Sequence, residues 1–372
     1  MPVLGCRARM LVASVVGLSG LTPRPTHQPS IAAAVEFYQA GELRRALDAL
    51  DTRTSGAQFT AALNGWINSA GAASESRRRF VAAAFALDAV WAATRASVRT
   101  FVFPPNEAVP LRSRQSLGVV AAWAARQMPP AGVVTPAERA LWLAAIGVAE
   151  DAEAWHALHT DALPLARERL PDEPRVRLAT VLASANVGLG SLRVFWIENV
   201  NPRKLREEHL PSSVTRRIPG AIRSFEALLA DASLAGEVEL RIGYLELRRR
   251  SWSEAVKKFE AARTKTADSL LQATAHYLEG WVHEQRGDPD RAIAAYRQAL
   301  SVTPTMRNLA TRLSALLFLR DERTEAYAIL DRAVNARPIP IDLLESLECG
   351  DSRFVAEWLA TVRQGLPALP LS

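Results

Sequence analysis

A regular repeat in the second half of the chain limits the possible folds more than any other sequence feature. Small, apolar and proline residues recur at one fixed interval: Ala292 and Ala326, Tyr296 and Leu330, Ala299 and Ala333, and Pro304 and Pro338. Two earlier pairs extend the pattern, with a slightly longer joint before Ala292: Ala255 and Phe259, and Ala221 and Phe225. A period of about 34 residues predicts stacked supersecondary units, each in contact with its neighbours.

Residues 273–304 show what one such unit contains. They read as a helix that ends at Gly287, a short Gly-Asp-Pro-Asp turn, and a second helix that stops before Pro304. Gly280 offers a small site where the two helices approach closely, and Tyr296 fills the space between them. This unit resembles a tetratricopeptide repeat (TPR), and the resemblance extends over residues 221–338. It implies an all-α fold, an α-solenoid of antiparallel helix pairs that forms a TPR-like superhelix.

The remaining segments are predicted to be helical but less regular. Residues 140–171 have the residue types typical of several repeat positions. After them, an insertion at about 188–218 separates the first helix of the next repeat from its second helix. After the last repeat, segment 341–348 and helix 353–363 are expected to cap the array, with Phe354, Trp358 and Leu359 covering its exposed end. The predicted parts are a signal peptide (1–21), a Pro-rich spacer (22–30), an irregular helical region of degenerate repeats (31–135), the TPR-like array with its insertion (136–338), and a C-terminal capping helix and tail (339–372).

Segment 1–21 has the pattern of a secretory signal peptide. Arg7 and Arg9 precede the apolar run 10–21, and a Pro-rich segment follows it. This run is too short for a membrane-spanning helix, which needs about 20 residues. We therefore expect an exported bacterial protein, periplasmic or secreted, without a transmembrane span. The alternative is a cytoplasmic protein with a frayed N-terminus or a misassigned start.

The charge of the chain comes mainly from arginine. There are 45 basic and 39 acidic residues, a net charge of +6, and only four lysines: Lys204, Lys257, Lys258 and Lys265. Arginine pairs with acids and covers apolar surface, and the excess is small for 372 residues. A solvated, ion-paired surface is therefore favoured, and no nucleic-acid partner is expected, although a nucleic-acid-binding solenoid remains an alternative. The two cysteines, Cys6 and Cys349, form no disulfide framework or metal knuckle pattern.

The sequence contains no recognisable catalytic motif. A phosphate-binding loop, a His-Glu-x-x-His pair, a nucleophile elbow and an aspartate cluster are all absent from it. His276, Glu279 and His283 share one helix face, but the repeat places this face at helix contacts, which favours packed histidines over a metal site. We therefore predict no catalytic residue, no metal and no cofactor. The alternative is a helical enzyme or enzyme subunit with its site in the N-terminal half.

The TPR resemblance implies a concave groove lined by the first helix of each repeat. In this chain its inward positions are Leu240, Tyr244, Arg248, Tyr277, Trp281, Glu284, Gln285, Asn308, Thr311 and Phe318. The aromatic side chains among them offer rigid contact area for an extended peptide or a helix; the alternative is that they pack on the next repeat or on the insertion. We predict a non-catalytic TPR-type scaffold that binds a partner peptide or helix in this groove, and make no prediction of its oligomeric state.

Overall fold

The computed structural model describes residues 31–50, 55–69, 72–99, 114–127, 133–151, 154–189, 212–304, 306–335 and 354–366. Every regular element in these ranges is a helix, which confirms the predicted all-α fold. The first half contains α1 (Ile31–Gln39), α2 (Leu43–Asp48), α3 (Gly56–Asn68), α4 (Ala72–Arg99), α5 (Arg114–Arg126), α6 (Pro136–Asp151), α7 (Trp155–Ala157), the π-helical turn η2 (Leu158–Ala162), α8 (Leu163–Arg169) and α9 (Pro174–Leu189). The second half contains α11 (Ser212–Thr215), α12 (Ile218–Glu226), α13 (Ala235–Arg248), α14 (Trp252–Lys265), α15 (Ser269–Gln285), α16 (Pro289–Val302), α17 (Arg307–Leu319), α18 (Arg323–Asn335) and α20 (Val355–Gly365).

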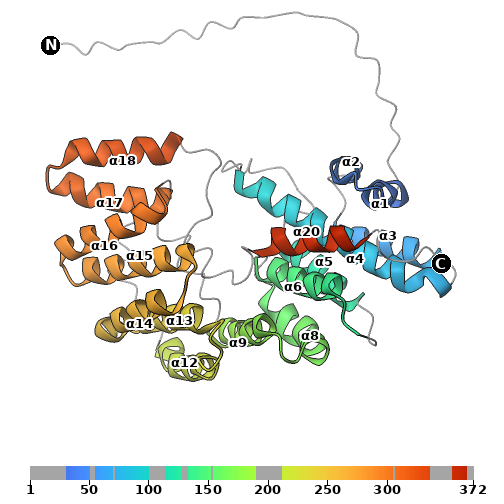
Figure 1. Cartoon of the computed structure of the whole chain (residues 1–372), viewed down its shortest axis with the longest axis horizontal. Coiled ribbons are helices and arrows are strands. Elements are labelled where there is room, and N and C mark those ends of the chain that lie inside the picture. Colours follow the sequence, from blue (N-terminus) through green and yellow to red (C-terminus); the bar gives the residue numbers. More distant parts are fainter. Residues whose placement is uncertain are drawn as a thin grey trace, which may run out of the picture.

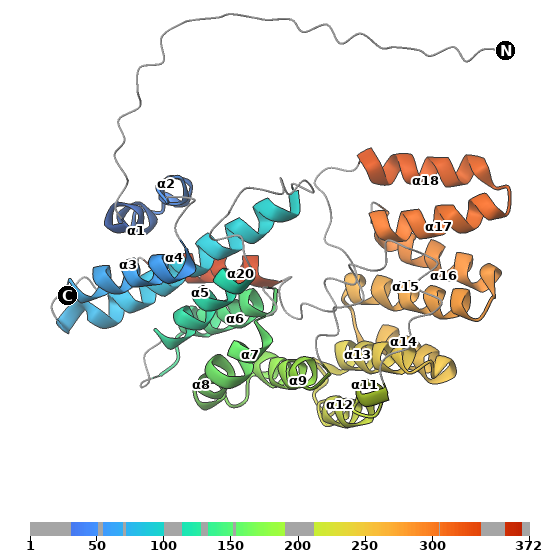
Figure 2. The same cartoon turned by 180° about the vertical axis from the view of Figure 1, so that it is seen from behind.

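The second half forms a stack of helical hairpins that ends at α18 (Figure 1 and Figure 2). α13 pairs with α14, α15 with α16 and α17 with α18, and each hairpin packs against the next. Local signals set the helix starts: the Asp268 side chain accepts hydrogen bonds at the start of α15, and Asp288 does so at the start of α16, where Pro289 follows. The predicted solenoid of antiparallel helix pairs is therefore confirmed.

Small residues allow the two helices of each hairpin to approach closely. A Cβ atom on Gly280 would lie 2.5 Å from the ring of Tyr296, and one on Gly243 would lie 2.6 Å from the ring of Phe259. At the equivalent position of the last hairpin, the Ser314 hydroxyl donates a 3.0 Å hydrogen bond to the backbone oxygen of Ala326. The register of the repeat thus correctly locates the helix contacts.

The N-terminal half is built around the long helix α4, which contacts α1, α3, α5 and α6. Residues 80–90 of this helix are all buried. The predicted pair at 140–171 is present as α6 followed by the helical segment α7, η2 and α8, which contains a π-helical turn just before Pro164. Alanine-rich faces let α4 and its neighbours pack closely, because alanine side chains occupy little volume between the helix axes.

The C-terminal helix α20 does not cap the repeat array. It packs against α6 and α4 in the N-terminal half, apart from α18 at the end of the stack (Figure 1). Its apolar stripe of Val355, Leu359 and Val362 is fully buried in the core of the N-terminal half, and Trp358 packs against the same core. The prediction that this helix covers the last repeat is therefore wrong, because its apolar stripe is buried against α6 and α4 in the core of the N-terminal half. Segment 341–348 lies outside the described residues.

The N-terminal half and the array share one apolar core through α9, α12 and α13. Ion pairs reinforce this junction: Arg175 Nη1 lies 2.7 Å from Glu237 Oε2, and Arg177 pairs with Asp231. The predicted signal peptide and spacer, and residues 190–211 of the predicted insertion, lie outside the described residues. None of the described helices is long and apolar enough to cross a bilayer.

Candidate functional site

The ten predicted groove residues lie on α13, α15 and α17, the first helices of three successive hairpins. The structure divides them into three groups by exposure. Four are buried in the core of the array, three (Arg248, Glu284 and Gln285) are partly covered, and three lie exposed on α17. The site that this arrangement offers to a partner is therefore concentrated at the end of the stack.

The aromatic residues expected to form an exposed strip are core residues in this structure. Tyr244, Tyr277 and Trp281 are 4, 4 and 5% exposed, and Leu240 is fully buried beside them. The ring of Tyr277 lies 5.7 Å from that of Tyr296 on the next helix, which shows how these side chains fill the space between helices. Partner binding through these four residues stays a prediction, and here they have almost no surface to offer.

Polar groove positions on α13 and α15 are engaged within the array. Glu284 Oε2 accepts hydrogen bonds from the Tyr296 hydroxyl at 2.9 Å and from Arg312 Nε at 2.8 Å. The Arg312 guanidinium also lies 5.3 Å from the centre of the Trp281 ring, a cation–π contact. Arg248 lies over the Tyr244 ring and donates a 3.3 Å hydrogen bond to its hydroxyl. Glu284 therefore joins α15 to α16 and α17, whereas Arg248 contacts a residue of its own helix, α13.

Charge at the Arg312 cluster is fixed by its surroundings. Burial disfavours the charged guanidinium, but the interactions with Tyr296, Tyr277 and Glu284 outweigh this effect and raise the pKa of Arg312. For Tyr296, burial itself raises the pKa well above its ordinary value. The hydroxyl therefore stays protonated and donates its hydrogen bond to Glu284. At neutral pH Arg312 is therefore charged and the Tyr296 hydroxyl is protonated, and both donate hydrogen bonds to Glu284.

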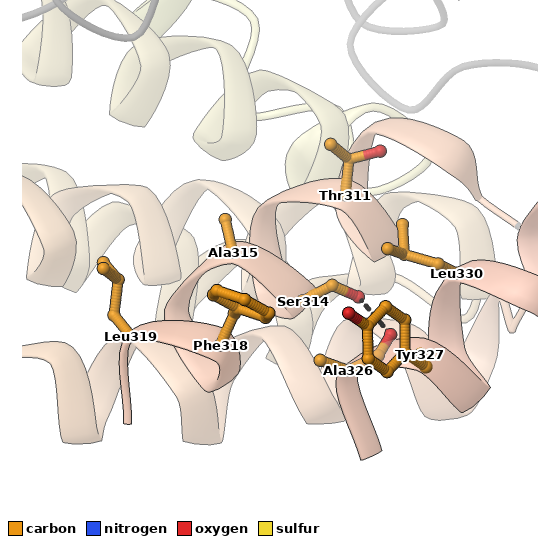
Figure 3. Close-up of a pocket in the computed structure, with 8 residues that line it drawn as sticks. All are labelled: Thr311, Ser314, Ala315, Phe318, Leu319, Ala326, Tyr327 and Leu330. Carbon is orange, nitrogen blue, oxygen red and sulfur yellow. Dashed lines mark hydrogen bonds between the residues drawn. The ribbon is translucent and has the colours of Figure 1, made fainter. Parts of the chain in front are cut away.

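The exposed members of the predicted set are Asn308, Thr311 and Phe318, and two of them line a hollow between α17 and α18. The hollow has a volume of about 450 Å³ and is drawn in Figure 3. Its lining consists of Thr311, Ser314, Ala315, Phe318, Leu319, Ala326, Tyr327 and Leu330. The rings of Phe318 and Tyr327 meet edge to face, with centroids 6.4 Å apart. We call this surface the end face.

Sequence reasoning missed Leu319, Tyr327 and Leu330 as members of the end face. Leu319 is 83% exposed, Tyr327 61% and Phe318 47%, so three large side chains with apolar surface lie exposed around the same hollow. The register of the repeat contains the necessary signal, since Tyr327 and Leu330 correspond to Ile293 and Tyr296 of the preceding hairpin. Their exposure depends on whether another helix packs beside α18, which the register alone does not specify.

Charged residues at the rim of the end face are paired among themselves. The Arg323 guanidinium lies 5.3 Å from the centre of the Phe318 ring and pairs with Asp321 at 2.8 Å. Arg320 pairs with Asp290 and also with Glu322 at 3.3 Å. Because each cation has an acidic neighbour, the end face does not carry a local charge excess that would select a strongly charged ligand.

The histidines of α15 are packed among polar neighbours. Glu279 Oε2 lies 2.5 Å from Arg263 Nη1, and its carboxylate oxygens are 3.9 Å from His276 Nδ1 and from His283 Nε2. Burial, and then the nearby Arg263, lower the pKa of His276. Among the residues that the structure describes, no three His, Cys, Asp or Glu side chains are placed to hold a metal ion.

Comparisons with known proteins bear on the repeat array. The tetratricopeptide repeat family model matches residues 215–269, 240–307 and 277–338. Two crystal structures of MamA are similar to the chain. The first is 16% identical and covers 51% of this chain and 92% of its own, with a TM-score of 0.34. The second is 17% identical and covers 53% of this chain and 91% of its own, with a TM-score of 0.33. This likeness is too low to carry an argument about function, and a search of curated proteins found no match. Residues 215–338, which include the stacked hairpins, match the tetratricopeptide repeat family model, in agreement with the resemblance seen in the sequence.

Proposed function

We propose that this chain is a non-catalytic protein-interaction scaffold, and that a partner protein binds it at the end face of the repeat array. TPR hairpins are an interaction fold, which supports the general role. The observation that carries the location is the apolar hollow between α17 and α18, with Phe318 and Tyr327 exposed at its edge. Exposed aromatic anchors beside a pocket are typical of binding hot spots.

The partner is expected to depend on these aromatic anchors. Phe318→Asp and Tyr327→Asp each place a charge in the hollow and should weaken capture of the partner from extracts of the native host. Losing a central anchor costs about 2 kcal/mol, or about 30-fold in affinity. Quantitative capture followed by mass spectrometry, with each variant compared against the unaltered chain, measures the effect.

Val302→Asp is the matched control, because Val302 is exposed on α16 and lies outside the hollow. It introduces the same charge and should leave capture unchanged. All three variants should keep the thermal midpoint of the parent chain, since the replaced side chains are on the surface. Equal capture by the Phe318, Tyr327 and Val302 variants would contradict the proposed location.

We also propose that the protein is exported. The support is the sequence pattern of segment 1–21, in which Arg7 and Arg9 precede a short apolar run. If a signal peptidase removes this segment, the mature protein from its native host should begin well after Met10. Mass spectrometry of the N-terminal peptide measures this directly. Recovery of the intact N-terminus from the soluble cytoplasm would overturn the proposal.

A further inference from the structure

The end face corresponds to a surface that is covered elsewhere in the array. One repeat earlier, Ile293 of α16 occupies the position that Tyr327 occupies on α18. Ile293 is 3% exposed, whereas Tyr327 is 61% exposed. The difference arises because α17 packs against α16, while among the described residues no helix occupies the same place beside α18.

Helix α17 shows what kind of element fits this surface. Its buried stripe consists of Leu309, Leu313 and Leu317, which recur at every fourth position and are at most 1% exposed. These leucines belong to the same apolar cluster as the buried residues of α16. The opposite side of α17 carries exposed residues such as Asn308 and Ala315. The element that covers one hairpin is thus an amphipathic helix with an aliphatic stripe.

We propose that the end face binds an amphipathic helix of a partner protein, whose aliphatic residues repeat every three to four positions as they do in α17. The partner would add one more first helix to the stack and so continue an interface that the array already uses between its hairpins. This proposal rests on the proposed function, and it specifies the structure and chemistry of the partner segment.

The polarity of the end face favours a helix over an extended peptide. Among the lining residues, only Thr311, Ser314 and Tyr327 carry side-chain hydroxyls. The Ser314 hydroxyl already donates a hydrogen bond to the backbone oxygen of Ala326. An extended segment would bury backbone N–H and C=O groups with few partners, whereas a helix satisfies its own. Because the rim cations are paired with acids, apolar burial would supply most of the binding energy.

A synthetic peptide of residues 306–319, which contains α17 and its N-cap residue Met306, is the probe for this proposal. It should bind the full-length chain in a fluorescence anisotropy titration and gain helicity on binding. Tyr327→Asp in the protein, or replacement of the three stripe leucines by serine in the peptide, should weaken binding at least tenfold. Val302→Asp in the protein should leave the affinity unchanged. A peptide with prolines at positions 310 and 315 tests the helical mode, and equal affinity for it would overturn the proposal.

A second arm separates a partner helix from a segment of this chain. Leu343, Leu344 and Leu347 lie one repeat period after Leu309, Ala310 and Leu313, outside the described residues. If the peptide binds only after these three leucines are replaced by serine, the occupant is that segment and the partner proposal fails. If the peptide fails in both proteins while Phe318→Asp still abolishes partner capture, the scaffold function stands and the helical mode alone is overturned.

Discussion

Ala292→Arg is expected to unfold the C-terminal part of the repeat array. Ala292 is fully buried on α16, where the close approach of neighbouring helices leaves no room for a long side chain. The substitution overpacks the core and buries a charge without a partner, and together these effects cost about 4 kcal/mol. Circular dichroism should show a lower thermal midpoint and lost helicity, and hydrogen exchange should place the loss in α15 to α18.

Ala294→Arg provides a matched control on the same helix. Ala294 is exposed, so the same residue with the same helix propensity is added where it meets solvent. This variant should unfold like the parent chain. If Ala292→Arg and Ala294→Arg have the same thermal midpoint, the register assigned to the repeats is incorrect.

Arg363→Met is expected to release the C-terminal helix from the N-terminal half. Asp88 on α4 is almost fully buried and accepts hydrogen bonds from Arg363 Nη1 at 2.5 Å and from the Tyr38 hydroxyl at 2.7 Å. Removing the arginine leaves a buried carboxylate without a cation, which costs about 3 kcal/mol of unfolding free energy. Denaturant unfolding and hydrogen exchange of α20 measure the loss.

Two further variants test this interpretation of the Asp88 contact. Gln364→Met changes an exposed neighbour on the same helix and should have little effect. Asp88→Asn combined with Arg363→Met removes both charges, so the double variant should recover much of the lost stability. A double variant as unstable as Arg363→Met alone would show that the loss comes from packing of the arginine side chain.

The pH dependence of Arg363→Met provides an independent check. Burial raises the pKa of Asp88, and the hydrogen bonds from Tyr38 and Arg363 oppose that rise. Without Arg363 the pKa of Asp88 should rise further. A carboxyl with a raised folded-state pKa destabilises the fold above that pKa, and the cost disappears as the pH falls through it towards the unfolded-state value. The stability deficit of the variant should therefore shrink as the pH falls from neutral into the acidic range, and a constant deficit would contradict this account.

The hairpins of the array were predictable because their signals are local in the chain. Gly280 and Tyr296 belong to the two helices of one hairpin, and their contact follows from the single turn between them. Asp268 and Asp288 cap helices through hydrogen bonds to residues two or three positions away. Such signals act within one hairpin and recur with it, so the repeat period revealed both the fold and the positions of the close contacts.

The placement of α20 could not be predicted in this way. Its apolar stripe could pack against any apolar surface of the right width. The chain offers two such surfaces, one on the last repeat and one on α6. The ion pair that joins it to the N-terminal half connects residues 275 positions apart. A long-range contact of this kind leaves no periodic trace in the chain, and proximity in sequence suggested the wrong neighbour.

The amino-acid sequence by itself determined the helical class, the hairpin register and the TPR array, because helix periodicity and small-residue spacing act over a few turns. Only the tertiary structure decided which apolar side chains are left at the surface. Trp281 and Phe318 were both predicted groove residues, yet Trp281 is buried within the array and Phe318 is exposed at the end of the stack. Exposure depends on the neighbours that packing brings together. Ile293 inside the array and Tyr327 at its end occupy the same repeat position, yet Ile293 is buried and Tyr327 is exposed.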